Sequence, residues 1–123
     1  MKITVSAKNI ELTSRVTEYI EDKINGLSRL VRVHDEQGAA DAYVEVKKTT
    51  RHHRKGDVFC AEVHLNLPGT TLLAASEDVD IFAAIDEIKD ELARQIKAYK
   101  GKRAAQFKKG MQEMKQEKLR GIL

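Results

Sequence analysis

The sequence predicts an α+β domain with the element order β-α-β-β-β-α, in which a four-stranded sheet carries two helices packed on one face. Three observations lead to this prediction. Four short segments alternate apolar and polar residues, as strands do when one face lies in water. Two longer segments place apolar residues three and four positions apart, as amphipathic helices do. Between the last three alternating segments stand Gly56 and the turn dipeptide Pro68-Gly69, where hairpins need them.

The first two elements are a strand and a helix. In residues 2–7, Ile3 and Val5 alternate with Thr4 and Ser6, which indicates a half-buried strand. Thr13 is a suitable N-cap for the helix that follows. Its apolar stripe predicts a helix that continues to Leu30 or Val31 and packs against the sheet. The earlier members of that stripe are Val16, Tyr19, Ile20, Ile24 and Leu27.

Three more strands are predicted as an antiparallel meander. Residues 42–47 alternate, residues 58–67 alternate most regularly, and residues 70–76 complete the set. Residues 34–40 follow neither period and predict a loop. Residues 50–57 predict a basic hairpin loop that turns at Gly56.

The last element is a long helix followed by a basic tail. Asp78 is a suitable N-cap, and Asp80 in the first turn favours the positive end of the helix dipole. We expect the helix to end near Gly101 and the domain to span residues 1–101. Residues 102–123 are predicted to form a basic C-terminal tail, partly helical or disordered. The apolar stripe of this helix is Ile81, Ile85, Ile88, Leu92, Ile96 and Tyr99.

Composition narrows the classes of function. A chain of 123 residues supports one domain with a modest core. Charged residues make up 33% and aromatic residues 5%, which favours a solvated exterior over the deep apolar pocket of an enzyme. Residues 101–123 hold seven Lys or Arg and two Glu, so of the net charge of +3 the tail carries +5 and the first hundred residues −2. A polyanion is therefore a plausible partner.

Cysteine content and hydropathy predict a soluble cytoplasmic protein. Cys60 is the single cysteine, so the chain cannot form an internal disulfide. The N-terminus has no charged stretch followed by an apolar run, as a secretory signal would. No apolar stretch approaches the roughly 18 to 20 residues that span a bilayer. We expect no contact with a membrane.

Cations gather on the polar sides of both helices. At 100° per residue, Arg94 and Lys97 lie opposite the apolar stripe, with Lys89 and Lys100 on one flank. One interpretation is an ordinary solvated face with pairs such as Asp90 and Arg94. The other is a surface for RNA phosphates, favoured by the accumulation of like charge at the helix end. The remaining cations of this predicted surface are Lys23, Arg29, Arg32, Lys102 and Arg103, and Arg15 lies in the first turn of the first helix.

The hairpin loop offers further candidates for RNA contact. Arg51, Arg54 and Lys55 lie at its tip, where a solvated loop is the default interpretation and phosphate contact the more specific one. The adjacent His52 and His53 could suggest a metal site. Neighbouring histidines tend to point apart, and no further ligands follow at metal spacing, so we expect no metal.

One strand carries residues that superficially suggest catalysis. Cys60, Glu62 and His64 share a strand face, but each is separated from the next by about 7 Å along the strand, beyond the reach of a nucleophile and its base. We expect them on an open sheet face. No glycine-rich phosphate cradle is present either. We therefore expect no enzymatic activity, no cofactor and no small-molecule substrate.

The residues of the second helix resemble a known family. The run from Glu77 to Asp86, followed by Leu92, Arg94-Gln95-Ile96 and the lysine-rich residues 97–102, closely resembles the ribosome hibernation promoting factor family, which includes ribosome-associated inhibitor A (protein Y). The segments 3–5 and 10–13 and the hairpin 54–57 also resemble it. The resemblance covers nearly all of residues 1–103.

The resemblance implies a fold similar to double-stranded RNA-binding domains and a specific mode of action. Family members bind the small ribosomal subunit in the mRNA channel over the A and P sites, and exclude mRNA and tRNA in stationary or starved cells. The family's cationic positions correspond here to Lys23, Arg29, Arg94, Lys100 and Lys102. The chain departs from the family pattern at Glu91, Gly26 and Ala98, where basic residues are common.

The chain stops at Leu123, so we expect a short form without the second domain that pairs ribosomes, and a monomer in solution. A different hypothesis remains open. The amphipathic tail, with Met111 and Met114, could dock on another protein, and the basic surface would then be incidental. The dependence of binding on salt distinguishes the two hypotheses.

Overall fold

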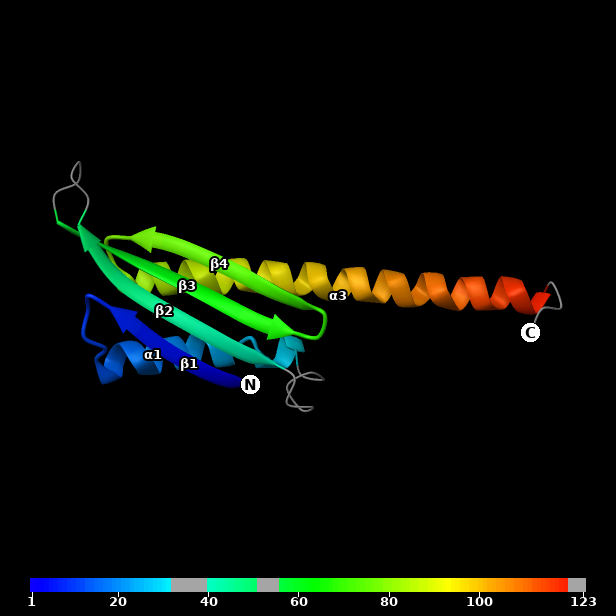
Figure 1. The fold of residues 1–123 in the computed structure, drawn as a ribbon, viewed down its shortest axis with the longest axis horizontal. Coiled ribbons are helices and arrows are strands. Elements are labelled where there is room, and N and C mark those ends of the chain that lie inside the picture. Colours follow the sequence, from blue (N-terminus) through cyan, green and yellow to red (C-terminus); the bar gives the residue numbers. More distant parts are fainter. Residues whose placement is uncertain (32–39, 51–55, 120–123) are drawn as a thin grey trace.

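The computed structural model describes residues 1–31, 40–50 and 56–119, and from residue 115 on only the course of the backbone. Within these residues the chain forms a four-stranded sheet with its helices on one face (Figure 1). This architecture confirms the predicted α+β fold and the order β-α-β-β-β-α. The elements are β1 (Lys2–Lys8), α1 (Ser14–Asn25), a 3-10 turn η1 (Ser28–Val31), β2 (Asp41–Thr50), β3 (Asp57–Leu67), β4 (Thr70–Asp78) and α3 (Ile81–Leu119).

The strands follow one another across the sheet in the order β1-β2-β3-β4. β2, β3 and β4 are antiparallel neighbours, so the predicted meander is confirmed, whereas β1 runs parallel to β2. A parallel pair needs a crossover, and α1 lies in that crossover. One row of paired residues crosses the whole sheet on its inner face, and it consists of Val5, Val44, Val63 and Ala74.

Two glycines make the hairpins possible. Gly56 has φ of 100° and Gly69 has φ of 80°, both in the region where a side chain would be strained. Gly69 follows Pro68, as a type II turn requires. The predicted turn at Pro68-Gly69 is therefore confirmed. Residues 51–55 of the other hairpin lie outside the described residues.

The core lies between the inner sheet face and the apolar stripes of the two helices. The stripe of α1 is buried as predicted at Val16, Ile20 and Ile24. On α3 the large apolar side chains of Ile85, Ile88, Leu92 and Ile96 are all 0% exposed. Burying an aliphatic side chain of this size stabilises the fold by about 1.5 to 3 kcal/mol. The two helices are thus fixed to the sheet, and their polar sides are turned to solvent.

The first helix ends earlier than its stripe predicts. Thr13 is the N-cap, and its Oγ1 accepts a hydrogen bond of 3.2 Å from the backbone N–H of Val16. The α-helix stops at Asn25, and the tighter turn η1 continues the stripe, so the prediction of one helix to Leu30 or Val31 is wrong. Leu27 and Val31 are nevertheless buried, because the 3-10 turn keeps them on the same side.

The cap of α3 is displaced by two residues from the predicted one. Asp80, not Asp78, precedes the first helical residue, and its Oδ1 accepts a hydrogen bond of 2.9 Å from the N–H of Phe82. Asp78 ends β4, and its carboxylate accepts from the N–H of Asp80 at 2.9 Å. The Asp78 carboxylate therefore stabilises the connection between β4 and α3, and the Asp80 carboxylate caps the first turn of α3.

The predicted end of the second helix near Gly101 is also wrong. α3 runs without interruption to Leu119 and extends far beyond the sheet (Figure 1). Glycine costs a helix about 1 kcal/mol relative to alanine but does not break it, and the residues around Gly101 are good helix formers. The helix therefore crosses the predicted domain boundary at residue 101.

Candidate nucleic-acid interface

The candidate interface is the solvent side of the two helices. The apolar stripe of α3 is buried against the sheet. The charged residues of α3 therefore occupy the helix positions that face away from the sheet. Arg94, Lys97 and Lys100 are exposed as predicted, and so is Arg29 on η1. Lys23 and Lys89 are half-buried, each on the flank of its helix.

These cations differ in what they contact. Lys23 pairs with Asp86 (Nζ to Oδ1 3.7 Å) and Lys89 with Asp90 (Nζ to Oδ1 3.5 Å). Exposed pairs of this kind contribute 0 to 1 kcal/mol, so a phosphate can replace the carboxylate at little cost. Within the described part of the chain, five cations of the predicted surface have no acidic partner, namely Arg29, Lys97, Lys100, Lys102 and Arg103.

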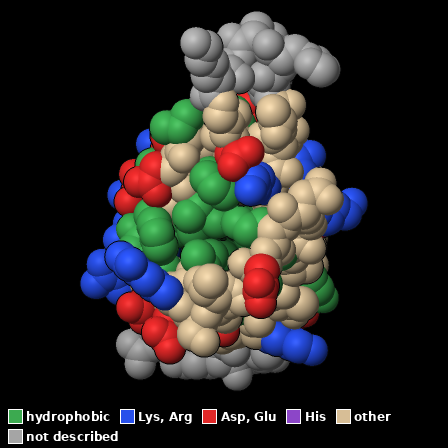
Figure 2. Space-filling view, turned by 90° about the vertical axis from the view of Figure 1, so that its left-hand side faces the viewer, with side chains coloured by type: hydrophobic (Ala, Val, Ile, Leu, Met, Phe, Trp, Pro, Cys, Tyr) green, Lys and Arg blue, Asp and Glu red, His purple; other side chains and the backbone are tan. Residues whose placement is uncertain are grey.

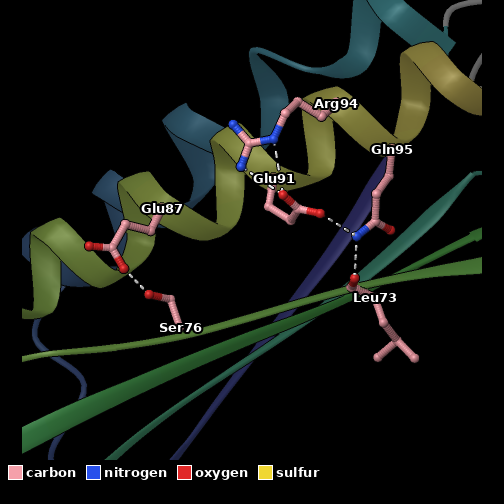
Figure 3. A network of polar contacts seen from close by, with 6 residues as sticks. All are labelled: Leu73, Ser76, Glu87, Glu91, Arg94 and Gln95. Carbon is pink, nitrogen blue, oxygen red and sulfur yellow. Dashed lines mark hydrogen bonds and ion pairs between the residues drawn. The ribbon is translucent and has the colours of Figure 1, made fainter.

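Glu91, Arg94 and Gln95 form a network that joins α3 to β4 (Figure 3). Arg94 donates to Oε2 of Glu91 from Nε at 3.0 Å and from Nη2 at 2.6 Å. Gln95 Nε2 donates to Oε1 of Glu91 at 3.1 Å and to the carbonyl oxygen of Leu73 at 2.7 Å. Beside it, Ser76 on β4 donates to the carboxylate of Glu87.

The network orients one of the predicted phosphate contacts. The hydrogen bonds from Gln95 and then Arg94 lower the pKa of Glu91. The partner of Arg94 is Glu91, three residues earlier, and not Asp90 as expected, since Asp90 contacts Lys89. The side chain of Arg94 is still 69% exposed. Glu91 therefore holds the Nε edge of the guanidinium and leaves most of the group accessible.

A second cluster joins α1 to the start of α3. The hydroxyl of Tyr19 donates to Oδ1 of Asp86 at 2.6 Å, and the Tyr19 ring packs edge-on against Phe82, with ring centroids 4.9 Å apart. Lys23 Nζ lies 5.3 Å from the centroid of the Tyr19 ring, and Arg15 Cζ lies 5.2 Å from that of Phe82. Both cations thus make favourable contacts with aromatic rings. These contacts fix the two helices side by side. Arg15 and Lys23 cover the aromatic rings on the side that faces solvent.

The same cluster raises the pKa of Tyr19 to about 12. The largest cause is the hydrogen bond to Asp86, which the phenol can donate only while protonated. Burial of the hydroxyl and the negative charges of Asp86 and Asp80 act in the same direction. Sequence analysis missed this contact, because Tyr19 and Asp86 are 67 residues apart.

Arg103 lies apart from the other helix-end cations. Its Nη1 donates to the Tyr99 hydroxyl at 2.8 Å and to the carbonyl oxygen of Pro68 at 3.4 Å. The Tyr99 hydroxyl donates to the same carbonyl at 3.0 Å. The structure therefore turns Arg103 toward the β3–β4 turn, and does not bring it together with Lys97 and Lys100 on the solvent side of α3.

Arg32, Arg51, Arg54 and Lys55 lie outside the described residues, so their RNA contacts stay predictions. His52 and His53 do as well. In the ranges that are described, no group of three or more His, Cys, Asp or Glu side chains could hold a metal ion. None of the helices there is long and apolar enough to cross a membrane.

Cys60, Glu62 and His64 lie on the sheet face opposite the helices, as expected. The prediction that their spacing keeps them out of reach is wrong for one pair, since His64 Nε2 lies 2.5 Å from Oε1 of Glu62. Residues two apart share a strand face, and these side chains are long enough to meet. Cys60 is half-buried on the same face.

A family described as "Sigma 54 modulation protein / S30EA ribosomal protein" matches residues 3–104. Over 109 residues the chain is 35% identical to the ribosome hibernation promotion factor of Deinococcus radiodurans, covering 89% of this chain and 54% of that protein. It is 28% identical over 102 residues to the ribosome hibernation promoting factor of Pseudomonas putida, covering 83% of this chain and 89% of that protein. The chain thus spans about half the length of the Deinococcus relative.

A solved structure has the same fold. The crystal structure of the N-terminal domain of Thermus thermophilus protein Y superposes with a TM-score of 0.61 at 29% sequence identity. The superposition covers 80% of this chain and 99% of that domain. The α3 extension beyond residue 104 lies outside the family match.

Proposed function

The chain belongs to the sigma 54 modulation protein / S30EA ribosomal protein family, and from this premise we propose that it is a ribosome hibernation factor. It binds the small ribosomal subunit in the mRNA channel near the A and P sites and represses translation by blocking mRNA and tRNA. It acts in the cytoplasm by occupying space, as a monomer, and catalyses no reaction. The names of the relatives and the charge of the helix side support this proposal.

One observation carries the proposal. Lys97 and Lys100 lie three residues apart on one side of α3, exposed and without an acidic partner among the residues with described side chains. Like charges so close together repel one another unless an anion lies between them. RNA supplies phosphates and releases its counterions on binding, which makes the association favourable. The open sheet face lacks this property, because Lys47 is there accompanied by Glu45, Glu62 and Glu77.

The rigidity of the helix pair supports the same function. The contact between Tyr19 and Asp86 fixes α1 to α3, and the network of Glu91 and Gln95 fixes α3 to β4. Binding therefore orders long Lys and Arg side chains but no backbone of these elements. A preorganised surface loses less conformational entropy on association than a flexible one. A rigid block is also what occlusion of a channel requires.

Reversal of two charges tests the proposal. The double variant Arg94→Glu/Lys97→Glu should keep its circular dichroism spectrum, because both side chains are exposed, and should no longer sediment with purified small subunits. The matched control is Lys2→Glu/Lys47→Glu, which makes the same change in net charge on the open sheet face. That variant should sediment almost as the unmodified protein does.

Two outcomes would contradict the proposal. One is undiminished sedimentation of the Arg94→Glu/Lys97→Glu variant at matched salt. The other is equal loss in both double variants, since binding would then follow net charge and not the helix side. For the unmodified protein, log K should fall linearly with log salt, with a slope of roughly −0.7 to −0.9 for each phosphate contacted.

A second candidate function has one observation in its favour. On the α3 extension Phe107, Met111 and Met114 are 72%, 54% and 59% exposed, and they share one side of the helix. Such a stripe is suited to docking on an apolar groove of another protein. Binding through it would hardly respond to salt and would be lost in Phe107→Ser/Met111→Ser, whereas Arg94→Glu/Lys97→Glu would leave it intact.

A further inference from the structure

A groove of about 530 Å³ lies where α3 leaves the sheet. The β3–β4 turn forms one wall, with Pro68, and one side of α3 forms the other. The groove is on the opposite flank of α3 from α1, since it adjoins β4. It lies within the size range of small-molecule sites, which is 300 to 1,000 Å³. Family resemblance assigns phosphate contact to Lys102 but nothing to this groove.

The groove is positively charged, and its described lining holds no counter-charge. Lys102 and Arg103 both line it, and among the residues that the structure describes no Asp or Glu does. The two described acceptors of Arg103 are neutral, the Tyr99 hydroxyl and the carbonyl oxygen of Pro68. Two adjacent cations in a concave site attract an anion more strongly than the same cations on a convex face. The groove is therefore suited to a ligand with at least one negative charge.

The floor of the groove is suited to a flat apolar group. Arg103 Cζ lies 5.5 Å from the centroid of the Tyr99 ring, and the hydrogen bonds of Nη1 hold the guanidinium in that place. A guanidinium has two faces, and stacks on planar groups with either of them. Leu72 adds apolar surface beside it, and Gln106 places an amide at the rim. An aromatic ring with hydrogen-bonding edges matches these groups.

We propose that this groove holds one unpaired nucleotide of an RNA strand. Its base stacks on the Arg103 and Tyr99 pair, its edge meets the Gln106 amide, and its phosphate contacts Lys102. Nucleobases are known to stack on aromatic rings and on arginine planes. That the strand is RNA rests on the proposed ribosomal function. The groove thereby adds a single-strand contact at the sheet edge to the phosphate contacts on the solvent side of the helices.

NMR titration of the full chain tests the proposal. Three probes are added separately, adenosine 5′-monophosphate, inorganic phosphate and a tetraglutamate peptide, while the amide signals of Gly69 and Gln106 are followed. The nucleotide should shift both signals and reach half saturation at a concentration about tenfold below that of phosphate, because stacking of a base contributes to binding. Tetraglutamate should bind no better than phosphate.

Two variants separate stacking from charge. Arg103→Lys keeps the positive charge but removes the planar guanidinium on which the base stacks. The nucleotide should then reach half saturation at the same concentration as phosphate. Lys109→Ala removes a cation of the extension that does not line the groove, and should leave the titration unchanged. Equal binding of nucleotide and phosphate, tighter binding of tetraglutamate, or an Arg103→Lys variant that still binds the nucleotide better than phosphate would each overturn the proposal.

The outcome is independent of the test of the proposed function. Sedimentation with small subunits but no nucleotide effect at Gly69 and Gln106 would refute the groove and leave the ribosomal role standing. A nucleotide effect without sedimentation would refute the ribosomal role, and with it the identification of the ligand as ribosomal RNA.

Discussion

The two halves of α3 have similar sequence patterns and different surroundings. In residues 81–100 the apolar side chains Ile88, Leu92 and Ile96 are 0% exposed, because the sheet lies beneath them. From residue 107 on the apolar side chains Phe107, Met111 and Met114 are largely exposed, because no described element lies beneath that part of the helix. Apolar residues recur at helical spacing in both halves, but this spacing does not say which half is covered.

The comparison separates two sources of helix stability. In the first half, packing against the sheet contributes most of the free energy, as it does in most protein helices. In the second half, helix propensity and continuation from an already formed helix are what remain. The first half thus fixes the basic side in place, and the second carries Lys108 and Lys109 away from the sheet.

The largest expected effect is a difference between two truncations. Leu92→Ala should lower the free energy of unfolding by about 2 to 5 kcal/mol, because it opens a cavity in the core. Met111→Ala removes a side chain of similar size from the extension and should change it by less than about 0.5 kcal/mol. Urea denaturation measures both. Equal losses of free energy would show that the extension is packed on the domain, and would contradict the conclusion that only the first half of α3 is covered.

A smaller effect concerns the joint between α1 and α3. Tyr19→Phe removes the hydrogen bond to Asp86 and should lower the free energy of unfolding by about 1 to 2 kcal/mol at neutral pH, as for bonds to charged groups. Met111→Ala is again the control. No loss in the Tyr19→Phe variant would mean that the first half of α3 is held by the sheet alone.

The pH dependence of that effect follows from the pKa of Tyr19. Because the folded pKa is about 12 and the ordinary value is 10, the bond contributes fully below pH 10 and is lost as pH rises toward 12. The difference in thermal stability between the unmodified protein and Tyr19→Phe should therefore narrow above pH 10. A difference that stays constant to pH 11.5 would contradict the assigned contact.

The smallest effect is local to the extension. At Gly110 an added Cβ would meet no atom within 4 Å, so Gly110→Ala should raise helix propensity by up to about 1 kcal/mol at that position. The helical circular dichroism signal should rise at 40 °C, while the urea midpoint of the domain stays unchanged. A shifted midpoint would show that the two halves unfold as one cooperative unit.

Local patterns predicted most of the fold. Alternation and helical stripes identified all four strands and both helices, because burial on one side produces those periods directly. The errors lie at element ends. Asp78 and Asp80 both accept backbone hydrogen bonds, so the sequence alone could not decide which one caps α3. Gly101 was taken as a helix end, although one glycine among good helix formers is tolerated.

The sequence predicted those site residues whose exposure follows from their position on the helix. It did not predict contacts between residues that lie far apart in the sequence. Arg94, Lys97 and Lys100 are exposed because the stripe is buried, which the sequence shows. The bond of Arg103 to Pro68 spans 35 residues, and no local pattern indicates it. The pair of Glu91 and Arg94, three residues apart, could have been found from helix spacing.

Competition on the small subunit tests the central claim most directly. Purified small subunits are incubated with increasing amounts of the protein, and the uptake of labelled mRNA and initiator tRNA is measured by filter binding. The account predicts that uptake of both falls in proportion to bound protein, and that Arg94→Glu/Lys97→Glu has no such effect. Full uptake of mRNA and tRNA by subunits saturated with the protein would contradict it.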